Sequence, residues 1–306
     1  MTTSMSRLRG VLSPVVTPFT NDLEPDSRRF VQHCRWLLDK GVGLAVFGTN
    51  SEGNSLSVAE RRKLLDALLA DGVDPARLMP GTGCCALPDT VELSKHATEA
   101  GCAGVLTLPP FYYKGQSDDG LFRSFSEVIQ RVGDARLRVY LYHIPPVAQV
   151  PLTLALIERL LREYPGVVAG IKDSSGDWSN TEAMLQRFQS DAFDVFCGSE
   201  VFLLQTMRGG GAGCITATGN VNPAAIVDLY KTWQNPDADE KQAGLTATRR
   251  IFEMMPMISS MKAAIAWKRN DDEWRNVRPP LMNAPDDKAA RLREALAEHG
   301  FDMPGL

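Results

Sequence analysis

The sequence has no long apolar stretch and no long run of basic residues. No segment is long enough to cross a bilayer as a helix, and residues 1–10 lack the apolar core of a secretory signal. We therefore expect a cytoplasmic location and no membrane partner. The longest basic tract is Arg61-Arg62-Lys63 and the formal net charge is −4, which argues against nucleic acid as a partner.

The sequence also lacks the spacing of metal and disulfide motifs. Its six cysteines contain no C-x-x-C pair, and its four histidines are too dispersed for a zinc site. In a cytoplasmic chain of this size we expect free cysteines, which behave as small apolar residues, rather than a disulfide framework. We also expect no metal and no cofactor. The cysteines are Cys34, Cys84, Cys85, Cys102, Cys197 and Cys214.

What the sequence does contain is a regular alternation of apolar runs and amphipathic stretches. Short apolar runs bounded by turn residues predict buried strands, and amphipathic stretches predict helices. The apolar runs are 10–16, 43–48, 77–81, 104–109, 137–143, 167–172, 193–198 and 213–218. The amphipathic stretches include 27–40, 57–70, 90–100, 118–131, 153–163 and 180–189.

Helix start and stop signals agree with this division. Ser57 and Glu60 have the spacing of a capping box, and Gly41, Gly72 and Gly101 stand where helices should end. Eight strands that alternate with helices predict an α/β fold in which parallel units close into a (β/α)8 TIM barrel.

The alternative fold is an open, doubly wound sheet. Such a sheet normally has a glycine-rich turn after its first strand, but here that turn is Thr17-Pro18-Phe19-Thr20. After residue 222 the strand pattern ceases. We expect a barrel over residues 1–222 and a C-terminal helical extension of the same domain over 223–306, with a loop near 276–286.

Lys172 is the strongest single candidate for chemistry. It ends the sixth apolar run, and a polar segment, Asp173-Ser174-Ser175-Gly176, follows it. Burial penalises the charged form of a lysine and favours the neutral amine, which is the form that attacks a carbonyl group. The alternative is a lysine that has left the sheet and reaches solvent.

Polar residues at the ends of neighbouring strands could assist such a lysine. In a barrel the active site is built on the C-terminal ends of the strands, where Thr49 and Tyr142 follow or close two of the runs. An amine that adds to a 2-oxo acid forms a carbinolamine and then a cationic imine, which accepts electrons during C–C cleavage or proton loss at C3. The Tyr142 phenol, relayed through Thr49, would carry the protons. Alternatively, Tyr142 only caps the core.

The order and spacing of these motifs resemble the dihydrodipicolinate synthase / N-acetylneuraminate lyase family of class I aldolases, which react through a Schiff base. The resemblance extends from residues 10–19 to residues 277–281. It implies a (β/α)8 barrel with a helical C-terminal extension, a homotetramer built from two dimers, and pyruvate as the 2-oxo acid. It also implies that Lys172 forms the imine, Tyr142 transfers protons and Thr49 is the relay hydroxyl.

The resemblance implies further contacts with the substrate. The backbone of Thr49 and Asn50 should hold the substrate carboxylate, and Gly198 and Ile215 resemble positions that line the pocket beside the imine. Tyr113 resembles the tyrosine that reaches into the neighbouring subunit's site, with Tyr112 as the alternative.

Several residues depart from the family pattern. Val147 stands where the synthases have an arginine that binds the carboxylate of the second substrate. Asn50 replaces a second threonine, Ser51 replaces a glycine, and His143 replaces an asparagine beside Tyr142. Because a valine cannot bind a carboxylate, we expect the second half of the substrate to be neutral.

Glu200 allows two interpretations. Acidic residues near this place bind substrate hydroxyls in sialic acid lyases, but a carboxylate at a helix start is an equally good interpretation.

Three hypotheses about function follow. The favoured one is a lyase that forms an imine at Lys172 with a 2-oxo acid, by reversible aldol cleavage of a 2-keto-3-deoxy acid to pyruvate or by dehydration of such an acid. The second is a dihydrodipicolinate synthase, which condenses pyruvate with aspartate semialdehyde, with a rearranged carboxylate-binding group. The third is a barrel that binds a 2-oxo acid without turnover.

Overall fold

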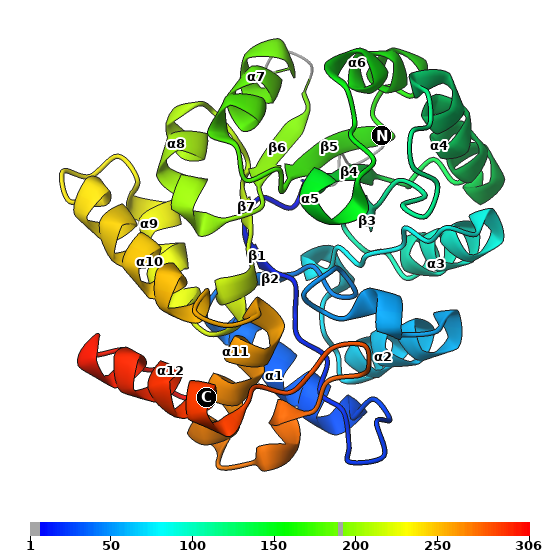
Figure 1. The fold of residues 1–306 in the computed structure, drawn as a ribbon. Helices are drawn as coiled ribbons and strands as arrows, with labels where there is room; N and C mark the ends of the chain where they lie inside the picture. Colours follow the sequence, from blue (N-terminus) through cyan, green and yellow to red (C-terminus); the bar gives the residue numbers. More distant parts are fainter. Residues whose placement is uncertain (1–6, 189–191) are drawn as a thin grey trace.

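A single parallel sheet forms the centre of the molecule, and helices surround it (Figure 1). The structure is a computed structural model that describes residues 7–188 and 192–306, so most of the segment checked for a secretory signal and the predicted helix end at residue 189 lie outside it. The strand order is β2-β1-β7-β6-β5-β4-β3. The strands are β1 (Gly10–Ser13), β2 (Gly43–Leu44), β3 (Val105–Thr107), β4 (Val139–His143), β5 (Val168–Asp173), β6 (Asp194–Cys197) and β7 (Gly213–Ile215).

The apolar run predicted as the third strand closes the ring, although it is not a continuous strand. A parallel bridge joins Leu78 to Leu44 of β2, and another joins Gly81 to Leu106 of β3. Between them, Pro80 has no N–H to donate but accepts a hydrogen bond from the Leu106 N–H at 2.9 Å. The sheet therefore closes as a barrel. This confirms the predicted (β/α)8 class and excludes the open doubly wound sheet.

The helices begin and end close to the predicted signals. Ser57 caps α2 in a reciprocal capping box with Glu60, and Gly41, Gly72 and Gly101 have positive φ just past three helices. The α-helices are α1 (Ser27–Asp39), α2 (Val58–Ala70), α3 (Leu87–Glu99), α4 (Asp118–Val132), α5 (Pro145–Ala148), α6 (Leu154–Glu163), α7 (Trp178–Phe188), α8 (Leu203–Arg208), α9 (Pro223–Thr232), α10 (Ala238–Phe252), α11 (Met257–Arg269) and α12 (Asp286–Glu298). The 3-10 helices are η1 (Gly53–Ser55), η2 (Pro75–Arg77), η3 (Glu200–Phe202), η4 (Ala217–Asn220) and η5 (Asp272–Arg275).

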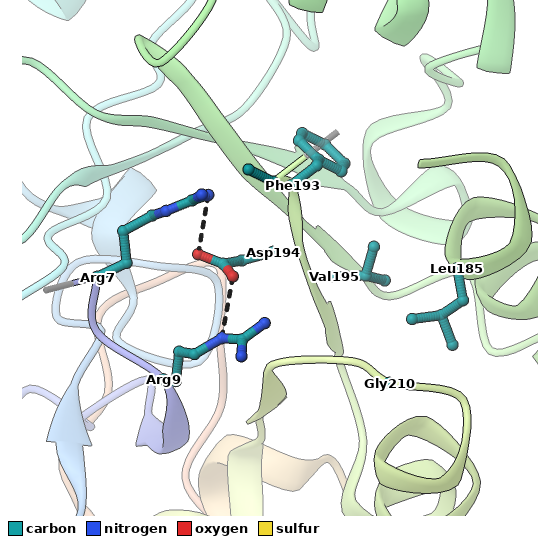
Figure 2. Close-up of a pocket in the computed structure, with 8 residues that line it drawn as sticks. Arg7, Arg9, Leu185, Phe193, Asp194, Val195 and Gly210 are labelled. Carbon is teal, nitrogen blue, oxygen red and sulfur yellow. Dashed lines mark hydrogen bonds and ion pairs between the residues drawn. The ribbon is translucent and has the colours of Figure 1, made fainter. Parts of the chain in front are cut away.

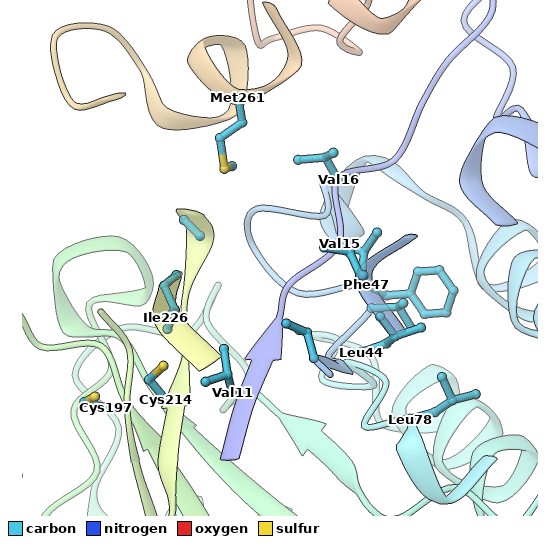
Figure 3. Packing of buried hydrophobic residues seen from close by; sticks show 14 of the residues in the cluster. Val11, Val15, Val16, Leu44, Phe47, Leu78, Cys197, Cys214, Ile226 and Met261 are labelled. Carbon is cyan, nitrogen blue, oxygen red and sulfur yellow. The ribbon is translucent and has the colours of Figure 1, made fainter. Parts of the chain in front are cut away.

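Strand alternation divides the core into two apolar layers. The outer layer lies between strands and helices, and in Figure 3 Val11, Cys197 and Cys214 lie there together with Ile226 of α9. The inner layer is a smaller cluster inside the barrel, which contains Tyr142. Every second residue of a strand faces the interior, so this alternation decides which polar side chains can meet there.

The C-terminal region is helical, as predicted. The helix α9 follows the last strand and packs against β1, and α12 lies outside α11 (Figure 1). The division of the chain at residue 222 stays a prediction. Over residues 7–188 and 192–306, no helix combines the length and apolarity that a membrane span requires. The same residues contain no group of three or more His, Cys, Asp or Glu side chains that could hold a metal ion.

Candidate active site

Lys172, Tyr142 and Thr49 meet at the C-terminal end of the barrel. Lys172 lies on β5 with only 2% of its surface exposed, and Tyr142 is its register partner on β4. The Lys172 Nζ donates to the Tyr142 hydroxyl at 3.2 Å, and that hydroxyl lies 3.1 Å from the Thr49 Oγ1. The three polar atoms therefore form one continuous hydrogen-bonded path.

No carboxylate pairs with the Lys172 amine among the residues that the structure describes. The phenol is its hydrogen-bond partner, and the amine also lies 4.3 Å from the centre of the Tyr142 ring. An amine placed beside a proton-carrying phenol suits a nucleophile that attacks a carbonyl carbon.

A cavity of about 210 Å³ adjoins this path. Lys172 and Tyr142 line it from the strands, Asn50 and Gly198 line it from two strand ends, and Arg249 lines it from α10. Its size suits a small organic acid.

Gly198 lets two strand ends approach closely beside the cavity. Its backbone N–H donates to the Asp173 carbonyl at 2.6 Å. A Cβ at residue 198 would lie 2.8 Å from that same carbonyl oxygen and closer still to the Ser174 hydroxyl. A larger residue would therefore push the end of β6 away from Lys172.

Asp173 lines the cavity but is engaged in local contacts. Its carboxylate accepts hydrogen bonds from the Ser175 N–H at 3.0 Å and from the Thr181 hydroxyl at 2.6 Å. His143 faces it, with the Nε2 lying 4.0 Å from the Asp173 Oδ1. The His143 Nδ1 accepts from the Leu152 N–H at 3.0 Å, and burial lowers the pKa of His143 although the Asp173 charge opposes that shift. Both side chains thus brace the strand ends and point away from the Tyr142 phenol.

Glu200 is buried behind the cavity wall. Its carboxylate accepts from the hydroxyls of Thr216 and Thr218 and forms an ion pair with Arg249 at 3.0 Å. Burial alone would lower the pKa of Arg249, but the charges of Glu200 and Glu253 raise it. Arg249 lines the cavity whereas Glu200 does not, so the charged side chain that faces the cavity here is the arginine.

Several residues considered in the sequence analysis do not line this cavity. Besides Glu200 they include Thr49, which contacts the Tyr142 phenol, and Ile215, Tyr112, Tyr113 and Val147. Ile215 is fully buried in the inner cluster of the barrel. Tyr112, Tyr113 and Val147 are exposed at the surface, and the two tyrosine rings meet edge to face at 5.5 Å. In a single chain Tyr113 therefore does not complete the site.

Arg249 is the charged cavity residue that the sequence did not indicate. It lies in the last turn of an amphipathic helix, far from any strand end, and nothing in the sequence separates it from a solvent-exposed arginine.

A larger cavity, of about 380 Å³, lies at the opposite end of the barrel, where Figure 2 shows Arg7 and Arg9 on either side of Asp194. The ion pairs measure 3.3 Å and 3.1 Å, and the Tyr140 hydroxyl also donates to Asp194 at 3.3 Å. Among the described residues that line it, none is a lysine, cysteine, serine or histidine that could act as a nucleophile. The C-terminal cavity, which is lined by Lys172 and Tyr142, is the candidate active site.

Comparison with known proteins gives matches over nearly the whole chain. The model of the family described as "Dihydrodipicolinate synthetase family" matches residues 7–299. A protein of Chloroflexus aurantiacus named "Uncharacterized DapA-like lyase" is 35% identical over 95% of this chain and 97% of its own length. The Escherichia coli protein YagE, named as a putative 2-dehydro-3-deoxy-D-gluconate aldolase, is 32% identical over 94% of this chain and 96% of its own.

Solved structures agree with the fold. The crystal structure of YagE in complex with pyruvate has a TM-score of 0.87 at 28% identity, and the match covers 97% of this chain and 100% of that one. The structure of dihydrodipicolinate synthase from Agrobacterium tumefaciens also has a TM-score of 0.87, at 29% identity, over 95% of this chain and 99% of that one.

Proposed function

Since this chain belongs to the dihydrodipicolinate synthetase family and is a lyase, we propose that it cleaves a 2-keto-3-deoxy acid reversibly to pyruvate and an aldehyde through an imine at Lys172. The observation that carries this proposal is the path from the Lys172 amine through the Tyr142 phenol to the Thr49 hydroxyl. A buried amine next to a proton-carrying group is what imine formation requires.

The reaction divides into steps that these side chains can serve. The Lys172 Nζ adds to the C2 carbonyl, and the carbinolamine loses water to give a cationic imine. The C4 hydroxyl then loses its proton while the C3–C4 bond breaks, which releases the aldehyde and leaves an enamine. Protonation of the enamine at C3 and hydrolysis of the imine release pyruvate. Tyr142 is the group placed to give and take these protons, and its hydroxyl shares a hydrogen bond with Thr49.

The turn that carries Thr49 is suited to the substrate carboxylate. Asn50 lines the cavity, and the backbone N–H groups of Thr49 and Asn50 donate no hydrogen bond within the described residues. Two adjacent free N–H groups form a common binding site for a carboxylate. They would hold the acid end of the substrate while the C2 carbonyl faces Lys172.

The opposite wall suits a hydroxylated body rather than a second acid. Arg249 faces the cavity, but the carboxylates of Glu200 and Glu253 already balance its charge. A guanidinium held between two carboxylates can donate hydrogen bonds to hydroxyl oxygens, whereas it offers less attraction to a second carboxylate. The name of the relative YagE, a putative 2-dehydro-3-deoxy-D-gluconate aldolase, agrees with such a substrate.

Two related reactions remain as alternatives. Dehydration of a 2-keto-3-deoxy acid uses the same imine and the same proton carrier, so no residue of the site separates it from aldol cleavage. Condensation of pyruvate with aspartate semialdehyde is favoured by one observation. The cavity wall contains an arginine, Arg249, whereas the exposed Val147 cannot bind a carboxylate. Arg249 would then be the rearranged carboxylate-binding group.

We propose a homotetramer of two dimers, in which Tyr113 completes the site of a neighbouring subunit. Its exposed ring supports this, although a solved relative at 25% identity is described as a monomeric variant. Sedimentation of the protein, together with the activity of a dimer-breaking variant at the Tyr113 surface, tests the assembly. An active monomer would contradict the role of Tyr113.

Borohydride reduction in the presence of pyruvate tests the imine. We expect a pyruvyl adduct on Lys172 by intact mass and peptide mapping, and none in Lys172→Ala. NMR of products from 2-keto-3-deoxy acids then separates pyruvate release from dehydration, and turnover of pyruvate plus aspartate semialdehyde tests the synthase. Failure to trap pyruvate and larger 2-oxo acids would end the lyase interpretation in favour of binding without turnover.

A further inference from the structure

The turn that carries Thr49 has a strained backbone. Phe47 and Glu52, neither of which is glycine, adopt positive φ angles of 64° and 54° on either side of it. The Phe47 carbonyl is wedged against Gly53, where a Cβ would lie within 2.1 Å of its oxygen. Non-glycine residues keep such conformations only where surrounding contacts impose them. Something outside the turn must therefore hold it.

A buried ion pair supplies that contact. The Glu52 carboxylate pairs with the ammonium of Lys262 from α11, and neither side chain has any exposed surface. The Lys262 Nζ also donates to the Asn276 carbonyl at 2.6 Å and lies 4.6 Å from the centre of the Phe19 ring. The C-terminal helices thus reach into the base of the turn.

The segment after η5 binds the same end of the turn. The Arg278 backbone N–H donates to the Glu52 carboxylate at 3.2 Å. The Arg278 guanidinium donates to the Ser55 carbonyl at 2.7 Å and to Glu60 of α2 at 3.0 Å. The end of the turn from Glu52 to Ser55 is therefore fixed by residues that lie more than 200 positions later in the chain.

Burial of this pair is costly. Desolvation raises the pKa of Glu52 and lowers the pKa of Lys262 to about 8, although each charge favours the other. Buried ion pairs are weak evidence for stability, because apolar residues of similar size often stabilise as well or better. Stability alone therefore does not explain why Glu52 and Lys262 are buried as a pair.

We propose that Lys262 is a positioning residue, which through Glu52 holds the Thr49 hydroxyl in hydrogen-bonding distance of the Tyr142 phenol. This inference rests on the proposed function. Lys262 touches neither the cavity nor the reacting atoms, so its loss should leave the Lys172 amine able to form an imine. It should impair only the proton transfers that pass through Tyr142 and Thr49.

The test separates imine formation from proton transfer. Borohydride trapping of pyruvate on Lys172 reports the imine, and exchange of pyruvate methyl hydrogens for deuterium, followed by NMR, reports proton transfer at C3. In Lys262→Met we expect trapping close to the wild-type extent and an exchange rate at least about tenfold lower. Exchange within about twofold of the wild-type rate would overturn the inference.

A double variant covers the case in which Lys262→Met does not fold. In Lys262→Met/Glu52→Gln no unpaired charge remains buried, so much of the lost stability should return. If Lys262 positions the turn, exchange stays slow in this variant although its melting temperature recovers. Recovery of exchange together with stability would mean that the pair is only structural, and would overturn the inference.

Arg29→Met is the matched control. Arg29 of α1 forms ion pairs at 2.7 Å with Asp271 and with Glu273, which join the same C-terminal region to the barrel without contacting the Thr49 turn. This variant should lose stability and keep normal exchange, whereas slow exchange in it would contradict a specific role for Lys262. A wild-type protein that traps no 2-oxo acid would overturn the proposed function, and this inference with it. Slow deuterium exchange in a Lys262→Met protein that still traps pyruvate would support the positioning role of Lys262.

Discussion

Two tyrosines of the same strand face the two ends of the barrel in very different surroundings. Tyr140 and Tyr142 lie two residues apart on β4 and both point inward. At the N-terminal end the Tyr140 hydroxyl donates to Asp194, a carboxylate that is also paired with two arginines. At the C-terminal end the Tyr142 hydroxyl meets the Lys172 amine, and no carboxylate of the described residues balances that amine.

The difference separates stability from function within one interior. Paired and hydrogen-bonded polar groups at the N-terminal end are satisfied and close the barrel (Figure 2). At the C-terminal end the buried Lys172 amine contacts a phenol instead of an acid, an arrangement that suits a nucleophile. In TIM barrels the residues of the active site lie at the C-terminal end of the strands, and residues at the N-terminal end contribute to stability. Variants at the C-terminal end should therefore lower activity and spare stability, whereas variants at the N-terminal end should lower stability and spare activity.

Replacement of Lys172 should give the largest effect on activity. Lys172→Met removes the only group proposed to bond covalently to the substrate, and we expect kcat to fall at least about 10³-fold. Its melting temperature should be no lower than that of the wild type, because methionine fills the same space without a buried amine. Steady-state kinetics and a thermal melt check both. A variant that is both inactive and clearly less stable would show that the amine also supports the fold.

Replacement of Tyr142 should have the next largest effect. Tyr142→Phe keeps the ring and removes the proton carrier between Lys172 and Thr49, so we expect a loss in kcat of about 10²- to 10³-fold with little change in stability. Lys172 should still be trapped with pyruvate by borohydride, although more slowly. A kcat within about threefold of the wild-type value would contradict the proposed proton path.

The sequence predicted the barrel and the strand that presents Lys172 because both depend on local patterns. Apolar runs, capping residues and glycine stops are patterns of residues that are close together in the sequence, so they predict the alternation of strands and helices. The continuous third strand was not correct, since Pro80 interrupts its hydrogen bonding. Pairing of Lys172 with Tyr142 followed from their positions at the ends of adjacent strands.

Contacts from the C-terminal helices could not be predicted in this way. Arg249 lies on the amphipathic helix α10, where an exposed and an inward-facing basic residue have the same local signature. Lys262 lies on α11 in a stretch, residues 259–266, that is buried throughout, but the sequence does not show which acid it meets. Their partners, Glu200 and Glu52, lie far away in the sequence, and only the packing of α10 and α11 on the barrel brings each pair together. The packing of helices depends on the whole chain, so no local sequence motif predicts these pairs.

At the N-terminal end, Asp194→Asn should lower stability and spare activity. The amide keeps the shape of the side chain but leaves Arg7 and Arg9 without their carboxylate, and we expect a loss of about 1–3 kcal/mol. Denaturant unfolding measures that loss, and kcat should stay within about threefold of the wild-type value. A large fall in kcat at unchanged stability would mean that the two ends are coupled.

Tyr140→Phe should give the smallest effect, and it distinguishes the two tyrosines most sharply. At pH 8 the variant loses one hydrogen bond to Asp194, worth about 1 kcal/mol, and should keep its activity. Burial, assisted by the Asp194 charge, raises the pKa of Tyr140 above its ordinary value, so the phenol ionises in the unfolded chain before it does so in the folded protein.

The stability that Tyr140 contributes is therefore complete below pH about 10 and is lost as the pH rises further, by up to about 1.4 kcal/mol per pH unit. Phenylalanine does not titrate. The difference in unfolding free energy between wild type and Tyr140→Phe should consequently shrink above pH 10, as denaturant unfolding from pH 8 to pH 11 would reveal. A difference that stays constant over this range would mean that Tyr140 titrates alike in both states, and that the N-terminal end is more open to water than its ion pairs indicate.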